Sequence, residues 1–225
     1  MKPFARILLG LGLATVVLAG PDEDAKKKPT LVDIVRDMRI RKHETAAIAT
    51  LRNITSAQAQ FQATGSVDVD NDGVGEYGAF AELSGAVTLR GTNRTMNPPV
   101  LSTAFRKVKN GVVTRSGYHF RVFLMGKKGP VGESATGGFD AATLDPKFTE
   151  TTWCVYAWPE KFGETGRRTF FVSHWGDILF AAKATYTGAQ GPAALAAFLP
   201  KQKTLGGKLA MGVAGQDANV WKVMR

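Results

Sequence analysis

The sequence predicts an α+β fold in which a long N-terminal helix packs on an antiparallel β-meander. Between residues 47 and 61, the positions that recur every three or four residues form one stripe: Ala47, Leu51, Ile54, Gln58 and Phe61. Residues 117–125 alternate with a period of two, which is typical of a strand. Further strand-like runs follow, separated by glycine-containing turns. A helix with one apolar stripe needs a surface to cover it, and the meander supplies that surface.

The helix is predicted to span residues 30–63. Thr30 is a suitable N-cap, Asp33 follows it as in a capping box, and Gly65 stands where a left-handed residue ends a helix. The first half has an apolar stripe of its own, formed by Leu31, Ile34, Val35 and Met38. Charged side chains crowd residues 36–42 and do not suit burial, so we expect the first half to project from the body.

Residues 1–20 are predicted to be an export signal peptide. Lys2 and Arg6 form its basic region, and residues 7–19 form an apolar region that is short for a membrane span. The alternative is an uncleaved N-terminal membrane anchor, and both interpretations place the remainder in the periplasm or outside the cell. Residues 21–29 carry an acidic run and then a basic run, which indicates a linker. Residues 30–225 are predicted to be a single domain.

The 225-residue chain is basic, with a formal net charge of +10 and a pI of about 9.8. This balance suits contact with an anionic surface such as lipid headgroups. The alternative is a solvated basic surface, because the charges are scattered along the chain and not gathered into one arm. We expect no nucleic-acid partner, and the residues identify no small-molecule substrate. The one cysteine, Cys154, excludes an internal disulfide.

An acidic loop follows the long helix and resembles the front half of a calcium-binding loop. Carboxylates alternate along it and a glycine then allows a sharp turn, an arrangement that suits the oxygen ligands of Ca²⁺. The candidate ligands are Asp68, Asp70, Asp72, the carbonyl group of Val74, and Glu76. The usual glutamate at the twelfth position is absent, since Ala79 stands there. The alternative is a turn in which the side chains bond their own backbone. Calcium, if bound, orders the loop and performs no chemistry.

The remaining elements are predicted in chain order. A short helix covers residues 80–83, and Asn110-Gly111 forms a tight turn. Residues 126–147 form an exposed excursion, residues 151–158, 168–175 and 178–183 are strands, and Gly176-Asp177 is a two-residue hairpin turn. Residues 192–199 are predicted to be a short helix and residues 220–223 a late strand. One face of the sheet should contact the helix and the other should face solvent.

A catalytic site is not expected. His43, His119 and His174 have no partner at the spacing of transition-metal ligands. Cys154 and His174 lie on successive predicted strands, so a nucleophile–base pair is conceivable, but a buried thiol beside an unrelated strand histidine is the favoured interpretation.

Several segments together resemble the pseudopilins and other type IV pilin-like proteins. Residues 44–58 are similar to the end of the pilin stalk helix, and residues 117–122, 157–159 and 166–172 are similar to headpiece strands. The same order of motifs resembles an uncharacterised family of exported bacterial proteins. The pseudopilin resemblance implies a pilin-like headpiece and a role beside type II secretion. The calcium site of major pseudopilins lies in a late loop, so it does not transfer to residues 68–72.

The helix departs from a prepilin stalk in one respect. Pro29 precedes it and charges follow between Arg36 and Lys42, so the segment cannot cross a bilayer without a large penalty. We therefore expect an exported, non-catalytic interaction or structural protein that binds other envelope or secretion proteins. The alternative is an exported enzyme or ligand-binding protein whose site lies in the excursion at residues 126–147.

Overall fold

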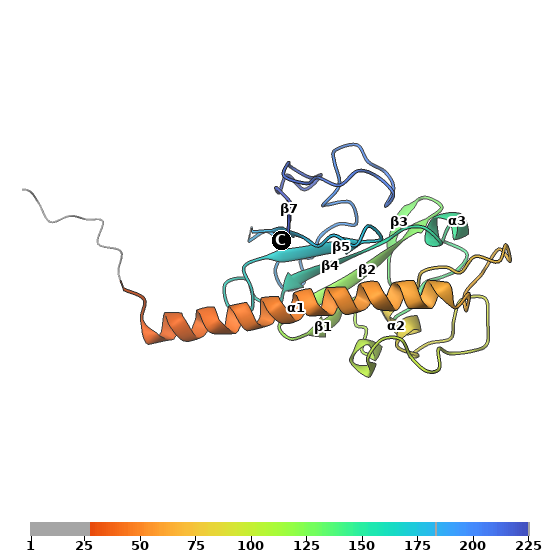
Figure 1. Ribbon diagram of the computed structural model, residues 1–225, viewed down its shortest axis with the longest axis horizontal. Coiled ribbons are helices and arrows are strands. Elements are labelled where there is room, and N and C mark those ends of the chain that lie inside the picture. The colour runs from red at the N-terminus through yellow and green to blue at the C-terminus, as the bar shows by residue number, and fades with distance from the viewer. Residues whose placement is uncertain (1–27, 183, 225) are drawn as a thin grey trace, which may run out of the picture.

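A computed structural model describes residues 28–182 and 184–224, and it begins with one long helix beside a sheet (Figure 1). Helix α1 (Leu31–Ala63) starts at Thr30, whose side chain accepts a hydrogen bond from the Asp33 N–H while the Asp33 carboxylate accepts from the Thr30 N–H. The left-handed Gly65 follows its end, with φ of 59°. The predicted helix and both of its ends are confirmed.

The sheet contains seven antiparallel strands, and the protein is therefore α+β. The strands are β1 (Val113–Arg115), β2 (Tyr118–Gly126), β3 (Gly129–Gly132), β4 (Trp153–Pro159), β5 (Thr169–Ser173), β6 (Leu179–Ala181) and β7 (Lys222–Val223). Their order is β1-β2-β4-β5-β6-β7, with β3 paired to β2. Neighbours in the chain are thus mostly neighbours in the sheet, as the predicted meander requires.

Three short helical segments complete the elements. They are α2 (Phe80–Leu83), the 3₁₀ turn Thr103–Arg106 and α3 (Pro146–Thr149). The prediction for residues 80–83 is confirmed. Asn110 and Gly111 both have positive φ, at 53° and 70°, which is the tight-turn geometry that the sequence predicts.

The inner face of the sheet holds the main core. Leu51, Ile54 and Phe61 of α1 are fully buried there, in one cluster with Phe120 of β2 and Val172 of β5. Each such side chain contributes about 1.5–3 kcal/mol when it leaves water. The predicted stripe is therefore the face by which α1 packs on the sheet.

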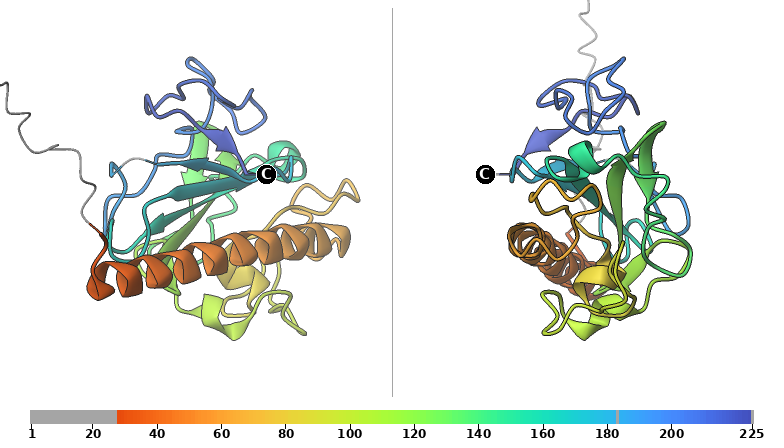
Figure 2. Two further views of the ribbon diagram at one scale, coloured as in Figure 1. Left: turned by 60° about the vertical axis from the view of Figure 1, so that its left-hand side comes forward. Right: turned by 90° about the vertical axis from the view of Figure 1, so that its right-hand side faces the viewer.

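The outer face of the sheet is also covered, which corrects the prediction that it faces solvent. Residues 186–221 cross it on the side away from α1, as both views in Figure 2 show. Trp221 and Phe198 from this segment pack on Tyr156 and Phe171 of the sheet. Strand β4 is consequently buried along its whole length. The loop-rich segment gave no periodic signal that predicts such burial.

Three further local predictions are wrong. Residues 192–199 form turns and no helix, because the Tyr156 hydroxyl donates to the Ala194 carbonyl and accepts from the Ala197 N–H, groups that a helix would use itself. Strand β5 ends at Ser173 and its pairing with β6 stops at Phe171 and Leu179, so the connection covers residues 174–178 and Gly176-Asp177 is only part of it. The excursion at residues 126–147 includes β3 and the start of α3, and it buries Leu144.

The export signal predicted at residues 1–20, and most of the linker predicted at residues 21–29, lie outside the described residues. Among the residues that are described, no helix combines the length and the apolar character needed to cross a membrane.

Candidate functional site

The acidic loop brings three of its five predicted ligands together. Carboxylate oxygens of Asp68, Asp70 and Asp72 lie within 4.8 Å of one another. Positive φ values at Asn71 (58°) and Gly73 (90°) curl the backbone so that the alternate side chains converge. Asp68 also accepts hydrogen bonds from the N–H groups of Asp72 (3.2 Å) and Gly73 (3.0 Å). The loop thus has the internal bonds of an Asp-rich turn and also a cluster of oxygens of the type that Ca²⁺ binds.

The other two candidates lie differently. Val74 is exposed at the loop tip. Glu76 is 1% exposed and turns into the protein, where its carboxylate accepts from the Val69 N–H (3.0 Å) and the Thr149 hydroxyl (2.7 Å). Glu76 therefore holds the base of the loop from inside and does not join the three aspartates.

A carboxylate from a distant segment approaches the same cluster. Burial raises the pKa of Glu150, and the nearby charges of Asp72 and Asp70 raise it further. Its Oε1 atom is inaccessible to solvent and has no hydrogen-bond partner among the described residues. Sequence reasoning missed Glu150, because only the fold brings α3 to the loop.

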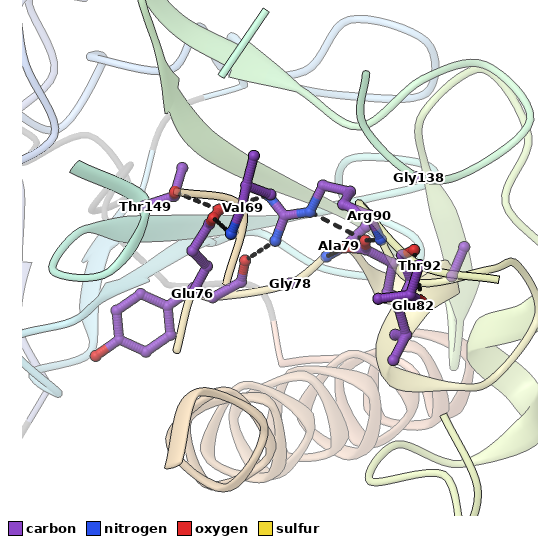
Figure 3. Close-up of polar contacts among 12 residues, drawn as sticks. Val69, Glu76, Gly78, Ala79, Glu82, Arg90, Thr92, Gly138 and Thr149 are labelled. Carbon is purple, nitrogen blue, oxygen red and sulfur yellow. Dashed lines mark hydrogen bonds and ion pairs between the residues drawn. The ribbon is translucent and has the colours of Figure 1, made fainter. Parts of the chain in front are cut away.

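An arginine at the centre of a buried network fixes the chain behind the loop (Figure 3). The Arg90 side chain is 3% exposed; its Nε lies 3.0 Å from Glu82 Oε1, and its Nη1 lies 3.4 Å from Glu76 Oε2. Its Nη2 donates to the Tyr77 carbonyl. The second oxygen of Glu82 accepts from the Ala79 N–H at 2.8 Å. The guanidinium thus connects both carboxylates with the backbone between them.

A third buried glutamate, Glu133, comes from the excursion at residues 126–147. It accepts from the N–H groups of Phe80 (3.3 Å) and Ala81 (2.9 Å) in α2, and from Gly138 (3.0 Å). Burial nevertheless raises its pKa from 4.5 to about 7, since the three N–H groups offset only part of the desolvation. The excursion is therefore packed onto the body through α2.

The conceivable nucleophile–base pair of Cys154 and His174 does not form. Cys154 stands opposite Ser173 in the register of β4 and β5, whereas His174 lies in the turn after β5, and no hydrogen bond joins the two side chains. The thiol is fully buried, its pKa is raised by that burial, and it donates to the Ala194 carbonyl at 3.7 Å. Cys154 is a core residue, as the favoured interpretation states.

The first part of α1 presents a second apolar face. Leu31, Val35 and Met38 are 80%, 63% and 65% exposed, whereas Ile40 is 3% exposed. Successive residues of a helix are rotated by about 100°, so Met38 and Ile40 point in nearly opposite directions. The exposed apolar stripe is therefore not a continuation of the buried one, and no described part of the chain covers it.

Ion pairs mark the place where α1 joins the body. The Glu44 carboxylate accepts from the Arg167 N–H at 2.9 Å and lies 2.6 Å from Arg168 Nη2. About two turns earlier, Asp37 lies 2.7 Å from Arg167 Nη2. The N-terminal part of α1 extends past the sheet, as Figure 1 shows. The prediction that the first half of the helix projects from the body is confirmed for this N-terminal part of α1.

Comparison with known proteins assigns the family. A family model described as "Protein of unknown function (DUF2950)" matches residues 29–203. The chain belongs to the DUF2950 family. No curated protein and no solved structure matches this DUF2950 chain. The resemblance to an uncharacterised family is thus supported, whereas the relationship to pseudopilins stays a prediction.

The DUF2950 match covers the helix, the acidic loop and strands β1 to β6. It ends before Trp221, which closes the outer core.

Proposed function

We propose that this protein is an exported, non-catalytic interaction protein of the bacterial envelope that binds its partner through the projecting part of α1. The observation that carries the proposal is the exposed apolar stripe formed by Leu31, Ile34, Val35 and Met38. Apolar surface of this kind, contiguous and rimmed by polar residues, is typical of interaction sites. The export signal that the sequence predicts at residues 1–20 places this surface in the periplasm or outside the cell.

The partner that suits this stripe is an amphipathic helix with acidic flanks. Arg39, Arg41 and Lys42 follow the stripe along α1 and attract such flanks. A second copy of this chain would bring the same cations against one another, which disfavours self-association through this face. Components of a secretion or pilus assembly are candidates, because the long helix lying on an antiparallel sheet agrees with the pilin-like headpiece that the resemblance implies.

Site-specific photo-crosslinking in cells tests the proposal. A photoreactive residue at Val35 should give an adduct with another exported envelope protein. The same residue at Arg52, which is exposed on α1 away from the stripe, should not. The absence of an adduct specific to Val35 would refute the proposal. So would an adduct of twice the chain mass, which indicates self-association, or an adduct with lipid alone, which indicates membrane contact.

We also propose that Ca²⁺ stabilises the acidic loop, held by Asp68, Asp70 and Asp72. The clustered oxygens support this, and Glu150 is a further ligand candidate, because a bound cation would offset the charges of Asp72 and Asp70 that raise its pKa. In calorimetric titration, Ca²⁺ should give a heat of binding with the native protein and none with D70N. Ca²⁺ should also raise the melting temperature of the native protein. No heat and no change in melting temperature would remove calcium from the function.

A further inference from the structure

The outer face of the sheet has a hollow that the covering segment, residues 186–221, does not fill. The hollow has a volume of about 400 Å³, at the lower end of the range for ligand sites. Its floor is formed by β1, β2 and β4, and its walls by the turn at residues 109–112 and the loop at residues 188–191. This site is distinct from the apolar stripe of α1, and it lies outside the excursion at residues 126–147.

Two cations in this hollow have no anionic partner. No carboxylate of a described residue lies within 4.0 Å of a side-chain nitrogen of Arg121 or Lys109. The Nε atom of Arg121 is inaccessible to solvent and has no hydrogen-bond partner among the described residues. Buried polar atoms in proteins are nearly always bonded, so the unsatisfied Nε of this hollow-lining arginine shows that the described residues do not neutralise its guanidinium group.

Packing holds the Arg121 guanidinium in place. It lies 5.1 Å from the ring centroid of Phe123, its neighbour on the same face of β2. A Cβ atom at Gly132 of β3 would lie only 2.6 Å from Arg121 Nε, so the guanidinium rests close on a strand that has no side chain there. A fixed guanidinium loses little conformational entropy when an anion binds to it.

A histidine two residues before Arg121 on β2 adds a hydrogen-bonding side chain to the hollow. His119 lies between Thr114 on β1 and Trp158 on β4 in the register of the sheet. Its Nδ1 is 2.7 Å from the Thr114 hydroxyl, and its ring centroid is 5.5 Å from that of Trp158. Burial lowers the pKa of His119, and the charge of Glu160 opposes this only in part.

The wall opposite is rigid. The Trp158 indole N–H donates to the Gly188 carbonyl at 2.8 Å. A Cβ atom at Gly191 would lie 2.6 Å from the Trp158 ring, so this loop approaches the indole as closely as only glycine allows. The shape of the hollow is therefore set before any ligand enters.

We propose that this hollow binds the phosphate group of a phosphate monoester, with Arg121 and Lys109 as its cationic partners and His119 as a hydrogen-bonding partner. A phosphate monoester carries a charge of about −1.5 to −2 at pH 7, which two permanent cations balance. The planar fork of Arg121 suits two phosphate oxygens at once, and Lys109 supplies a point charge from the turn. The monoester belongs either to a free small molecule or to a lipid headgroup.

Isothermal titration with glucose 6-phosphate and with vesicles containing phosphatidic acid tests this site and distinguishes the two sources. Binding to either probe supports the proposal, provided that glucose and neutral vesicles do not bind. K109Q and R121Q should each weaken binding at least tenfold. R94Q, which removes an equal charge from an exposed arginine elsewhere, should leave it unchanged. Equal weakening by R94Q, or no binding of either probe at millimolar concentration, would overturn the proposal.

Two further measurements keep the test valid if R121Q unfolds. Lys109 is exposed on a turn, so K109Q should fold normally and report on binding alone. In nuclear magnetic resonance titrations of the native protein, the probe should raise the pKa of His119, because a bound anion favours the imidazolium form. An unchanged His119 titration in the presence of saturating probe would contradict the assignment.

Discussion

Glu133 should make the stability of this protein fall as the pH rises from about 4.5 through about 7. Its pKa is raised from 4.5 to about 7 in the folded state, so between these values the folded protein holds a proton that the unfolded chain releases. The contribution of this proton to the free energy of unfolding is fully present below about pH 4.5, and it is lost as the pH rises through about 7. At about 1.4 kcal/mol for each pKa unit, the total loss is about 3 kcal/mol.

The substitution E133Q tests this directly, because glutamine has the shape of the neutral acid at every pH. Its carbonyl oxygen can still accept from Ala81 and Gly138, while the weaker bond from Phe80 at 3.3 Å is lost at a cost of about 1 kcal/mol. Relative to the native protein, E133Q should therefore gain about 3 kcal/mol of unfolding free energy between about pH 4 and about pH 8.5.

Urea unfolding at both pH values measures the difference. E164Q is the matched control: Glu164 is exposed and forms only a surface ion pair with Lys161, so its effect should be small and the same at both pH values. If the free-energy difference between E133Q and the native protein is equal at both pH values, the raised pKa inferred for Glu133 in the folded protein is wrong.

Three other changes have defined outcomes. R90M should destabilise the protein by about 3–5 kcal/mol in urea unfolding, because it leaves Glu82 buried without its cation, and adding E82Q should recover part of the loss. Q58L should cost about 2 kcal/mol through two lost backbone hydrogen bonds, whereas Q60L on the exposed side of α1 should cost little. Cys154 should react with a thiol reagent only at the rate of unfolding, and fast labelling of the native protein would show that its burial is misjudged.

The pattern along the chain predicted the elements that obey one period. The stripe through Leu51 and Phe61 needed only the helical repeat and two caps, and both ends of α1 followed from Thr30 and Gly65. The alternation at residues 117–125 predicted β2 for the same reason. These features are local. They depend on hydrogen bonds between residues close in the sequence and on whether each side chain faces water or the core.

Prediction failed where distant contacts outweigh local preference. Residues 192–199 contain helix-favouring alanines, yet Tyr156 holds their backbone in turns. In the acidic loop, the alternation of carboxylates predicted that Asp68, Asp70 and Asp72 converge, but it also included Glu76, which Thr149 binds inside the protein. Thr149 is far away in the sequence, so its hydrogen bond gave no local signal.

The sequence by itself therefore determined the α+β class, the long capped helix, the strands of the meander and the convergence of three aspartates. Only the tertiary structure decided which residues share a site. It covered the outer face of the sheet with a segment that has no periodicity, placed Arg90 between two buried glutamates, and left Arg121 and Lys109 in a hollow where no carboxylate of the described residues pairs with them. The reason is physical: periodicity reports whether a side chain leaves water, whereas pairing between distant charges depends on how the whole chain closes on itself.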